Sequence, residues 1–363
     1  MSRPTVFDIA VMGGGPAGLV AALTAPNSAR TALVLNRPPD HSAPVRIDAI
    51  PARTLALLVE LGIEPRAIGA DCLHNCQRVC WESDTPNWGR GARTAHIERP
   101  LLECALFNLL LAHNRVKIIT DRKRPSFDGV FHGTGWRATN VVDATGRASL
   151  TSRTRIRLKP RCASRFYWTS RDAAPSATPE FHIAALAGGY AYRLGSARRI
   201  GIGFVGGGEF LNSDPEQILK DAAWLRDGMP SFASMKRGAS GVTSVQWAVP
   251  GHAALADDAA IARDPLSSQG LAASLSDALY AIAAISSGKL DSLHMRQAEN
   301  LAAHLKHLGE QIIRCRYRNS PLWSAYEQSI GEAKPNLVEG QAPAIRHRRL
   351  EAVLPGSHRV RSL

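Results

Sequence analysis

The 363-residue sequence has few cysteines, a shortage of acidic residues and no long apolar run, and each shortage excludes a class of protein. Six cysteines are too few for a disulfide scaffold in a chain of this length. No apolar run approaches the roughly 20 residues that cross a bilayer, and a strand follows the start of the sequence directly. We therefore expect no membrane span and no secretory signal, in a soluble protein whose thiols stay reduced in the cytoplasm.

Three of the cysteines, Cys72, Cys76 and Cys80, recur at every fourth residue with His74 between them. On a helix this spacing would put three thiols on one face, which raises the possibility of a metal site. The segment lacks the CxxC pairs of zinc sites, and RVCW (78–81) is typical of a strand. We expect buried thiols here and no metal.

Acidic residues number 31 against 44 lysines and arginines, which leaves a net charge of +13. The basic residues are densest at 121–125, 155–161 and 346–349. None of these stretches has the pattern of a helix-turn-helix, a zinc finger or an RNA-recognition motif, so we expect no nucleic-acid partner. A basic face of this kind is better suited to docking an acidic partner protein.

The stretch VFDIAVMGGGPAGLVAAL (6–23) predicts a buried strand, a tight glycine turn and a helix. Gly13 permits the turn, Gly15 lets a pyrophosphate approach the backbone, and Gly18 lets the helix lie close to its strand. The phosphates would meet the N–H groups at the helix N-terminus. The sequence therefore predicts a dinucleotide site that includes Gly13, Gly15, Pro16, Ala17 and Gly18.

The second strand, RTALVLNR (30–37), should end in an acidic residue that holds the ribose hydroxyls, but Asn36 stands there. An amide can still accept one hydroxyl and donate to another. Arg37 follows, and a basic residue at this point could instead accommodate the 2′-phosphate of NADP. An NADP-dependent dehydrogenase therefore stays open as an alternative.

Further along, residues 45–63 predict a loop that becomes an amphipathic helix, and 98–113 predict a helix followed by a strand at 116–120. Residues 83–93 are loop-like. Strands at 135–149 close in a glycine-containing turn. This order of strands and helices predicts a parallel sheet covered by helices.

From about 156 to 247 alternating strands predict an antiparallel sheet with one inserted helix at 215–227. Residues 254–279 then predict a strand end, a loop and a long helix, and a second long helix is expected at 290–318. Beyond residue 331 the chain is rich in proline and basic residues, and we expect a loosely held tail.

Three separated segments resemble the flavoprotein monooxygenase superfamily, which includes aromatic hydroxylases and flavin-dependent halogenases. They are GGGPAG (13–18), NVVDATGRAS (140–149) and DDAAIARDPLSSQG (257–270). The resemblance implies an α/β chain (α+β overall) with a Rossmann-like FAD domain, an antiparallel-sheet substrate domain and C-terminal helices. The expected boundaries are 1–70, 96–155 and 248–310 for the FAD-binding domain, 71–95 and 156–247 for the substrate domain, 311–330 for the end of the C-terminal helix and 331–363 for the tail.

The resemblance also implies roles for individual residues. Asp258 would hold a ribityl hydroxyl of FAD, and Pro265 would lie near the isoalloxazine ring. Ser268, Gln269 and Gly270 would start a helix whose N–H groups face the flavin edge that becomes negative on reduction.

Arg46 and Arg99 match arginines that reach FAD in the superfamily, with a solvated surface arginine as the alternative for each. Asn36 departs from the superfamily pattern, and so does Asp257, which stands where a glycine is usual. Its Cβ lies where close backbone approach is common, and its carboxylate is adjacent to that of Asp258. We therefore expect weaker FAD binding than is typical.

A branch of the superfamily is most similar: the lysine ε-oxidase and glycine oxidase maturases, which help to build tryptophylquinone cofactors. The similarity lies in RIDAIPA (46–52), GGYAYRLG (188–195), RDPLSSQG (263–270) and RNSPLW (318–323). It implies a monooxygenase that uses FAD, dioxygen and NAD(P)H or a separate reductase to hydroxylate a tryptophan of an apo amine or amino-acid oxidase. A hydroxylase or halogenase of a small aromatic molecule and a flavin-binding chaperone without turnover are the alternatives. The W-x-W-x-I-P stretch of halogenases is not evident.

The antiparallel domain would cover the flavin and shape the substrate site. Its aromatic side chains could cradle a ring, although such residues are more often core. Asp48 is the best polar candidate, with a role as an arginine partner or as a helix cap as the alternatives, and His182 could act as an acid or base or be structural. No catalytic side chain is identified. The predicted substrate-site residues are Asp48, His182, Tyr190, Tyr192 and Trp247, with Trp168 on a neighbouring strand.

Overall fold

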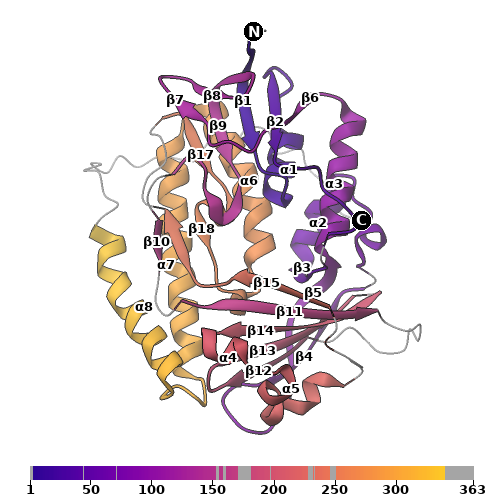
Figure 1. Ribbon diagram of the computed structural model, residues 1–363, viewed down its shortest axis with the longest axis vertical. Helices are drawn as coiled ribbons and strands as arrows, with labels where there is room; N and C mark the ends of the chain where they lie inside the picture. The colour runs from indigo at the N-terminus through magenta and orange to yellow at the C-terminus, as the bar shows by residue number, and fades with distance from the viewer. Residues whose placement is uncertain are drawn as a thin grey trace, which may run out of the picture.

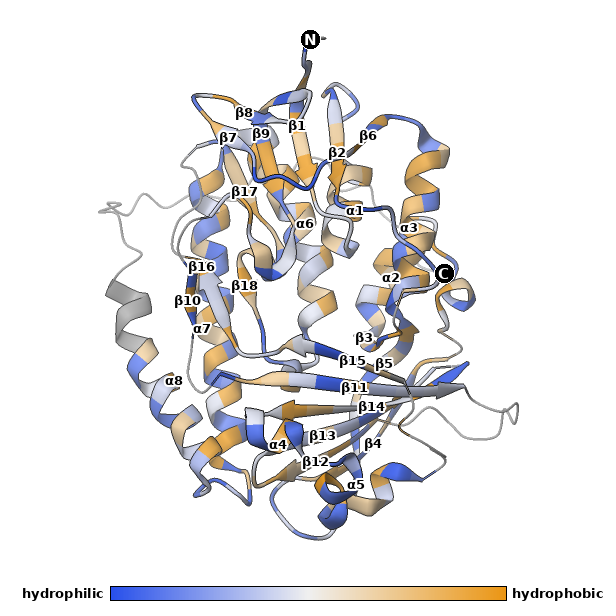
Figure 2. Ribbon diagram, viewed as in Figure 1, coloured by the Kyte–Doolittle hydropathy of each residue, from blue (hydrophilic) through white to orange (hydrophobic). Residues whose placement is uncertain are grey.

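The computed structural model describes residues 3–43, 45–70, 72–152, 155–157, 161–170, 181–196, 198–227, 232, 234–245 and 251–339. Two sheets lie one above the other, and the long helix α7 (Leu290–Ile313) runs alongside both (Figure 1). Apolar residues concentrate on the inner strands of the upper sheet, whereas hydrophilic and hydrophobic segments alternate along α7 (Figure 2).

The upper sheet has the order β6-β2-β1-β9-β8-β7. β8 pairs with residues 136–138 of β9, and β17 pairs with residues 141–143 of the same strand. Strands β6, β2, β1, β9 and β17 are parallel, as the sequence predicted for this part of the chain, and the short β7 and β8 add an antiparallel hairpin. The strands are β1 (Thr5–Met12), β2 (Thr31–Leu35), β6 (Val116–Thr120), β7 (Ser126–Phe127), β8 (Phe131–Gly133), β9 (Trp136–Asp143) and β17 (Ala253–Leu255).

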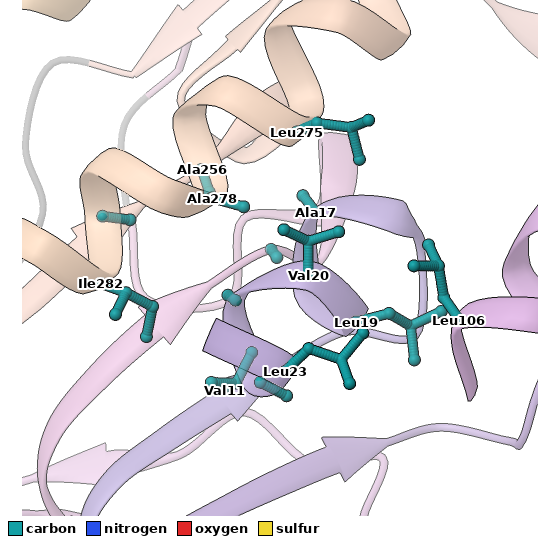
Figure 3. Packing of buried hydrophobic residues seen from close by; sticks show 14 of the residues in the cluster. Val11, Ala17, Leu19, Val20, Leu23, Leu106, Ala256, Leu275, Ala278 and Ile282 are labelled. Atoms are coloured by element: carbon teal, nitrogen blue, oxygen red, sulfur yellow. The ribbon is translucent and has the colours of Figure 1, made fainter. Parts of the chain in front are cut away.

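The helix α1 (Pro16–Thr24) is the centre of the upper core. Most of its side chains are buried, because it lies between β1 and the helices α3 (Arg99–His113) and α6 (Gly270–Ser287). Figure 3 shows Ala17 and Val20 of α1 facing Leu275 and Ala278 of α6. α6 is apolar and long enough to span a membrane by composition alone, but it packs against α1 inside the protein.

The lower sheet has eight strands in the order β15-β11-β14-β13-β12-β4-β5-β3, all antiparallel except the β12–β4 pair. Its antiparallel strands agree with the pattern predicted for 156–247. The strands are β3 (Ile47–Pro51), β4 (His74–Cys80), β5 (Asn87–Glu98), β11 (Ala163–Ser170), β12 (Phe181–Leu186), β13 (Gly189–Gly195), β14 (Arg199–Gly206) and β15 (Ser234–Ala239).

One face of the lower sheet is covered by the short elements α4 (Gly208–Asn212), α5 (Pro215–Ile218) and η3 (Lys220–Arg226). The other face packs against α7 and α8 (Pro321–Glu339). The remaining elements are α2 (Ala52–Glu60), a small sheet of β10 (Arg155–Arg157), β16 (Thr243–Val245) and β18 (Ile261–Ala262), and the 3-10 turns η1 (Pro65–Ile68), η2 (Gly146–Ala148), η4 (Asp257–Ala259) and η5 (Pro265–Ser267).

Two expectations about the C-terminal and inserted helices were wrong. The helix expected at 290–318 ends at Ile313, and a further helix, α8, begins at Pro321 and runs into the predicted tail. Its buried residues Trp323, Tyr326 and Ile330 have helical spacing and pack against α7. The helix expected at 215–227 is broken, because Ala222 has a non-helical φ of −145°.

Two expectations about the first half of the chain were also wrong. The loop expected at the start of 45–63 contains β3, and most of the loop-like 83–93 belongs to β5, which β4 holds by cross-strand pairing. The prediction of buried thiols fails for Cys72 and Cys76, which are exposed; Cys80 is buried.

We predict that Gly13→Ala lowers the free energy of unfolding by about 3 kcal/mol. Gly13 has a φ of +115°, and a Cβ there would lie 2.3 Å from the Ala144 carbonyl oxygen. Gly15→Ala is the matched control, because Gly15 has a φ of −78° and no heavy atom within 4 Å of an added Cβ. Its cost should be about 0.5 kcal/mol. Equal losses for the two variants in urea unfolding would contradict this account.

Candidate functional site

The three segments that carry the superfamily resemblance meet at the carboxyl ends of adjacent parallel strands. Met12 at the end of β1 lies beside Asp143 of β9, and Asp143 lies beside Leu255 of β17. The Ala144 N–H donates to the Met12 carbonyl (2.8 Å), and the Ala256 N–H donates to the Asp143 carbonyl (2.9 Å). In parallel α/β sheets this edge is where ligands bind.

The glycine turn lies as close to the helix α1 as the spacing of its glycines predicted. An added Cβ at Gly18 would lie 2.0 Å from the Gly13 carbonyl oxygen, so only glycine allows helix and turn to approach this closely. The space beside Gly15 is open. No side chain caps the N-terminus of α1, where Pro16 and Ala17 form the first turn. Its N–H groups are therefore available to an anion.

At the end of β2, Asn36 and Arg37 are both exposed. Their roles toward a ribose or a 2′-phosphate stay predictions.

Asp143 fixes the turn that follows β9. This fully buried carboxylate accepts hydrogen bonds from the N–H and hydroxyl of Thr145 (3.0 and 2.6 Å) and of Thr151 (2.7 and 2.8 Å). Four donors satisfy the hydrogen-bonding capacity of its two oxygens, which offsets the cost of burying this side chain in the core. Asp143 is therefore a structural residue that positions the turn beside the glycine loop.

Asp258 lies in η4, next to this turn. Its carboxylate is 3.6 Å from the Arg147 guanidinium and is about a third exposed, at 36%. Arg155 donates to the main-chain carbonyls of Asp258 and Ala259, which fixes the backbone of η4. The carboxylate is thus held in place but still open to a ligand hydroxyl.

Asp257 has the left-handed backbone that a glycine would favour, with a φ of +58°. Burial and repulsion from the neighbouring Asp258 raise the pKa of its carboxyl to about 7. The replacement of the usual glycine by Asp257 therefore changes both the backbone and the charge of the candidate site.

Asp264 is a buried carboxylic acid that directly precedes the loop of Pro265. It accepts hydrogen bonds from Tyr190 of β13 (2.6 Å), Tyr326 of α8 (2.7 Å) and the Leu266 N–H (2.9 Å). Burial raises the pKa of this carboxyl, and these hydrogen bonds act against that shift. Asp264 therefore joins the loop to the lower sheet and to the C-terminal helix.

The loop itself leads into α6. Pro265, Ser268 and Gln269 are exposed, Gly270 is half-buried, and no side chain caps the N-terminus of α6. Its first N–H groups are therefore available to an electron-rich edge of a ligand.

Asp48 lies between the two arginines predicted to reach the cofactor. Its carboxylate accepts from Arg46 (2.9 Å) and from Arg99 (2.6 Å). Burial alone would raise the pKa of Asp48, but the two guanidinium groups lower it well below its usual range. Asp48 is therefore a partner of two arginines, which was one of the alternatives that the sequence left open. Because its lowered pKa keeps it ionised, it is unsuited to act as a catalytic acid.

Glu103 and Lys236 lie within electrostatic range of this cluster, and the sequence did not single them out. Burial raises the pKa of Glu103 and lowers that of Lys236. Both residues come from elements distant in sequence, α3 and the edge strand β15, so no local motif could have found them.

Tyr190 and Tyr192 point to the face of the lower sheet that packs against α7 and α8. Two glycines of β14 make room for rings on this face: a Cβ at Gly203 would lie 2.2 Å from the ring of Tyr192, and one at Gly201 would lie 2.2 Å from Phe166. Burial raises the pKa of Tyr192 to about 12, so its hydroxyl stays protonated. The rings form an apolar wall with Trp168 beside Phe166.

His182 does not belong to this wall, which corrects the sequence prediction. Ile183 pairs with Tyr192, so His182 projects to the opposite face, where its ring packs against Trp88 and Trp224. The predicted Trp247 lies outside the described residues.

The residues at this junction fit FAD. A glycine cradle and two uncapped helix N-termini suit its anionic parts, and Asp258 could accept from a ribityl hydroxyl. Asp257 adds a carboxyl group, and when this group is ionised it disfavours the binding of a pyrophosphate. Among the described residues no group of three or more histidine, cysteine or acidic side chains could hold a metal ion.

The comparison with known proteins agrees with this geometry. No protein-family model and no curated protein sequence matches the chain. Among solved structures, the peptidyl tryptophan dihydroxylase QhpG, essential for tryptophylquinone cofactor biogenesis, is 19% identical with a TM-score of 0.70 over 90% of this chain and 79% of its own. The FAD-dependent halogenase CndH, the myxobacterial chondrochloren halogenase, is 18% identical with a TM-score of 0.72 over 94% and 91%.

A third structure, 2,6-dihydroxypyridine-3-hydroxylase from Arthrobacter nicotinovorans, is 17% identical with a TM-score of 0.65 over 87% of this chain and 94% of its own. The expected likeness to flavoprotein monooxygenases and halogenases is thereby confirmed at the level of the fold. The chain has the fold that flavin-dependent halogenases and aromatic hydroxylases share.

Proposed function

We propose that this protein is an FAD-dependent monooxygenase that hydroxylates a tryptophan side chain of a partner protein during maturation of a quinone cofactor. The observation that carries the proposal is the meeting of the glycine turn, the Asp143 turn and the Asp258 segment at one sheet edge, which Asp264 joins to the sheet that carries the aromatic wall. The fold likeness to a peptidyl tryptophan dihydroxylase supports the same substrate class.

The reaction takes two electrons and two protons, with NAD(P)H or a separate reductase as the electron source. One atom of dioxygen enters the aromatic ring in place of hydrogen, and the other leaves as water. FAD would supply the activation of dioxygen. The chain would supply anion-binding N–H groups at α1 and α6, orient the flavin through Asp258 and the Asp264-anchored loop, and exclude water with Phe166 and Tyr192.

Small-molecule hydroxylation or halogenation is the second candidate function, because two of the similar structures are a halogenase and a hydroxypyridine hydroxylase. A chaperone without turnover is the third, and the Asp257 carboxyl beside the cofactor site favours it. The NADP-dependent dehydrogenase is less well supported, because the α6 N-terminus and the Asp264-anchored loop would then have no role.

The direct test is oxygen transfer to a peptide-bonded indole. Protein loaded with FAD and reduced without oxygen is mixed with ¹⁸O₂-saturated buffer and N-acetyl-tryptophanamide, with N-acetyl-tyrosinamide as the matched control. We expect a product that carries one labelled oxygen from the indole alone. Quantitative release of hydrogen peroxide with both probes would contradict hydroxylation, and a product that requires added bromide or chloride would favour the halogenase alternative.

Gly15→Ala should weaken FAD binding at least about tenfold, because the new methyl group would fill the open space that a pyrophosphate needs. Fluorescence quenching of added FAD measures the dissociation constant. The near-normal stability expected of this variant separates a binding effect from misfolding. Unchanged affinity would show that the cofactor does not use the glycine turn.

FAD affinity should fall on the order of tenfold between pH 6 and pH 8, because Asp257 loses its proton near pH 7 and then repels the pyrophosphate. Asp257→Asn keeps the shape and the left-handed backbone but carries no charge. Its affinity should stay flat across this interval and match that of the unaltered protein at pH 6. The same pH dependence in both proteins would exclude Asp257 as the cause.

A further inference from the structure

One stretch of β5 forms an open edge of the lower sheet. β5 pairs with β4 over 87–94 on one side and with β3 over 94–98 on the other. In the part of the chain that the structure describes, no strand lies beside residues 87–93 on the β3 side. A strand edge of this length offers main-chain N–H and C=O groups to a further strand.

Trp88 stands on this edge as a large exposed aromatic residue, at 58% exposure. The guanidinium of Arg78 lies 5.7 Å from its ring centroid, and the His182 ring meets it edge-on at 5.9 Å. His182, Arg78 and Trp88 lie opposite one another on β12, β4 and β5. The side chain is thus held in position without being buried, which lowers the entropy cost of using it as an anchor.

The charge on the edge is of one sign. Arg90 and Arg93 are exposed, and NWGRGAR (87–93) contains no acidic residue. A second copy of the chain added here would bring arginines close to arginines, which is unfavourable. An acidic strand would be favoured instead.

The glycines of this stretch lie on the same face of the lower sheet as the aromatic wall. Gly89 and Gly91 lie on the opposite side of the strand from Trp88, where their nearest neighbour is the Gln77 side chain. Across the sheet, Gln77 lies between Gly89 of β5 and Phe181 of β12. Phe181 packs against the cluster that contains Tyr192.

We propose that residues 87–93 of β5 bind an acidic, extended segment of a partner protein as an added β-strand, with Trp88 as the anchor. This rests on the proposed function in one respect: the partner is the protein whose tryptophan is oxidised. Alternate side chains of the added strand would point to the glycine side, which is the face of the sheet that carries the aromatic wall, while the main chain supplies the affinity.

The probe is a fluorescein-labelled synthetic peptide that alternates glutamate with valine. We expect it to bind the full protein and to slow hydrogen exchange of the amides in 87–93. Trp88→Ala, and separately the double substitution R90E/R93E, should weaken binding at least about tenfold. The double substitution R122E/K123E is the matched control, because it makes the same charge change at exposed residues outside β5 and should leave affinity unchanged.

A second peptide, N-methylated at every other residue, has the same charge but cannot pair with a strand edge, and it should not bind. Equal affinity of the two peptides, or an equal loss from the R122E/K123E control, would overturn the proposal in favour of general charge attraction. Hydrogen exchange of the amides in 87–93 is also measured without peptide at several protein concentrations. If protection increases with protein concentration, the edge binds a second copy of the chain and the proposal is overturned. None of these readouts needs FAD or turnover, so failure here is distinguishable from failure of the monooxygenase proposal.

Discussion

The structure depends on a close backbone junction between β1, β9 and β17. Main-chain hydrogen bonds join Gly13 to the end of β2, Ala144 to the end of β1, and Ala256 to the end of β9. This junction requires glycine at 13 and 18, because any side chain would occupy the space of a carbonyl group. The N-cap of α1 is Gly15, which has no side chain to bond the first N–H groups of the helix. The anion site therefore lies directly beside the junction that closes the fold.

A second constraint ties this junction to the lower sheet. Asp264 accepts hydrogen bonds from hydroxyl groups of β13 and α8. The next residue, Pro265, begins the loop that precedes α6. A carboxylate this deeply buried is costly unless its hydrogen bonds are made, so removal of either tyrosine would leave an unsatisfied acceptor. The position of the predicted flavin loop is thus set by residues of two separate elements, β13 and α8. This coupling fixes the loop relative to β13, the strand that also carries Tyr192 of the aromatic wall.

Sequence reasoning predicted the parts of the fold around the candidate site that depend on local chemistry. The spacing of Gly13, Gly15 and Gly18 and the order of the surrounding elements are local features, and the structure has them. The Asp264–Tyr326 contact joins residues 62 positions apart, so no periodicity reports it. The error on His182 has a geometric cause: its face depends on the β12–β13 register, which pairs Leu186 with Gly189. Locating that turn among its glycines would have placed His182 away from the tyrosines.

The most direct test of the central claim is whether the purified protein binds FAD stoichiometrically. Titration followed by the flavin absorption spectrum and fluorescence should show one FAD per chain with a perturbed spectrum, and NADP should not displace it. Absence of FAD binding at any pH between 6 and 8, with saturable binding of NADP in its place, would contradict the account. It would favour the NADP-dependent dehydrogenase, in which Asn36 and Arg37 bind the ribose and its 2′-phosphate.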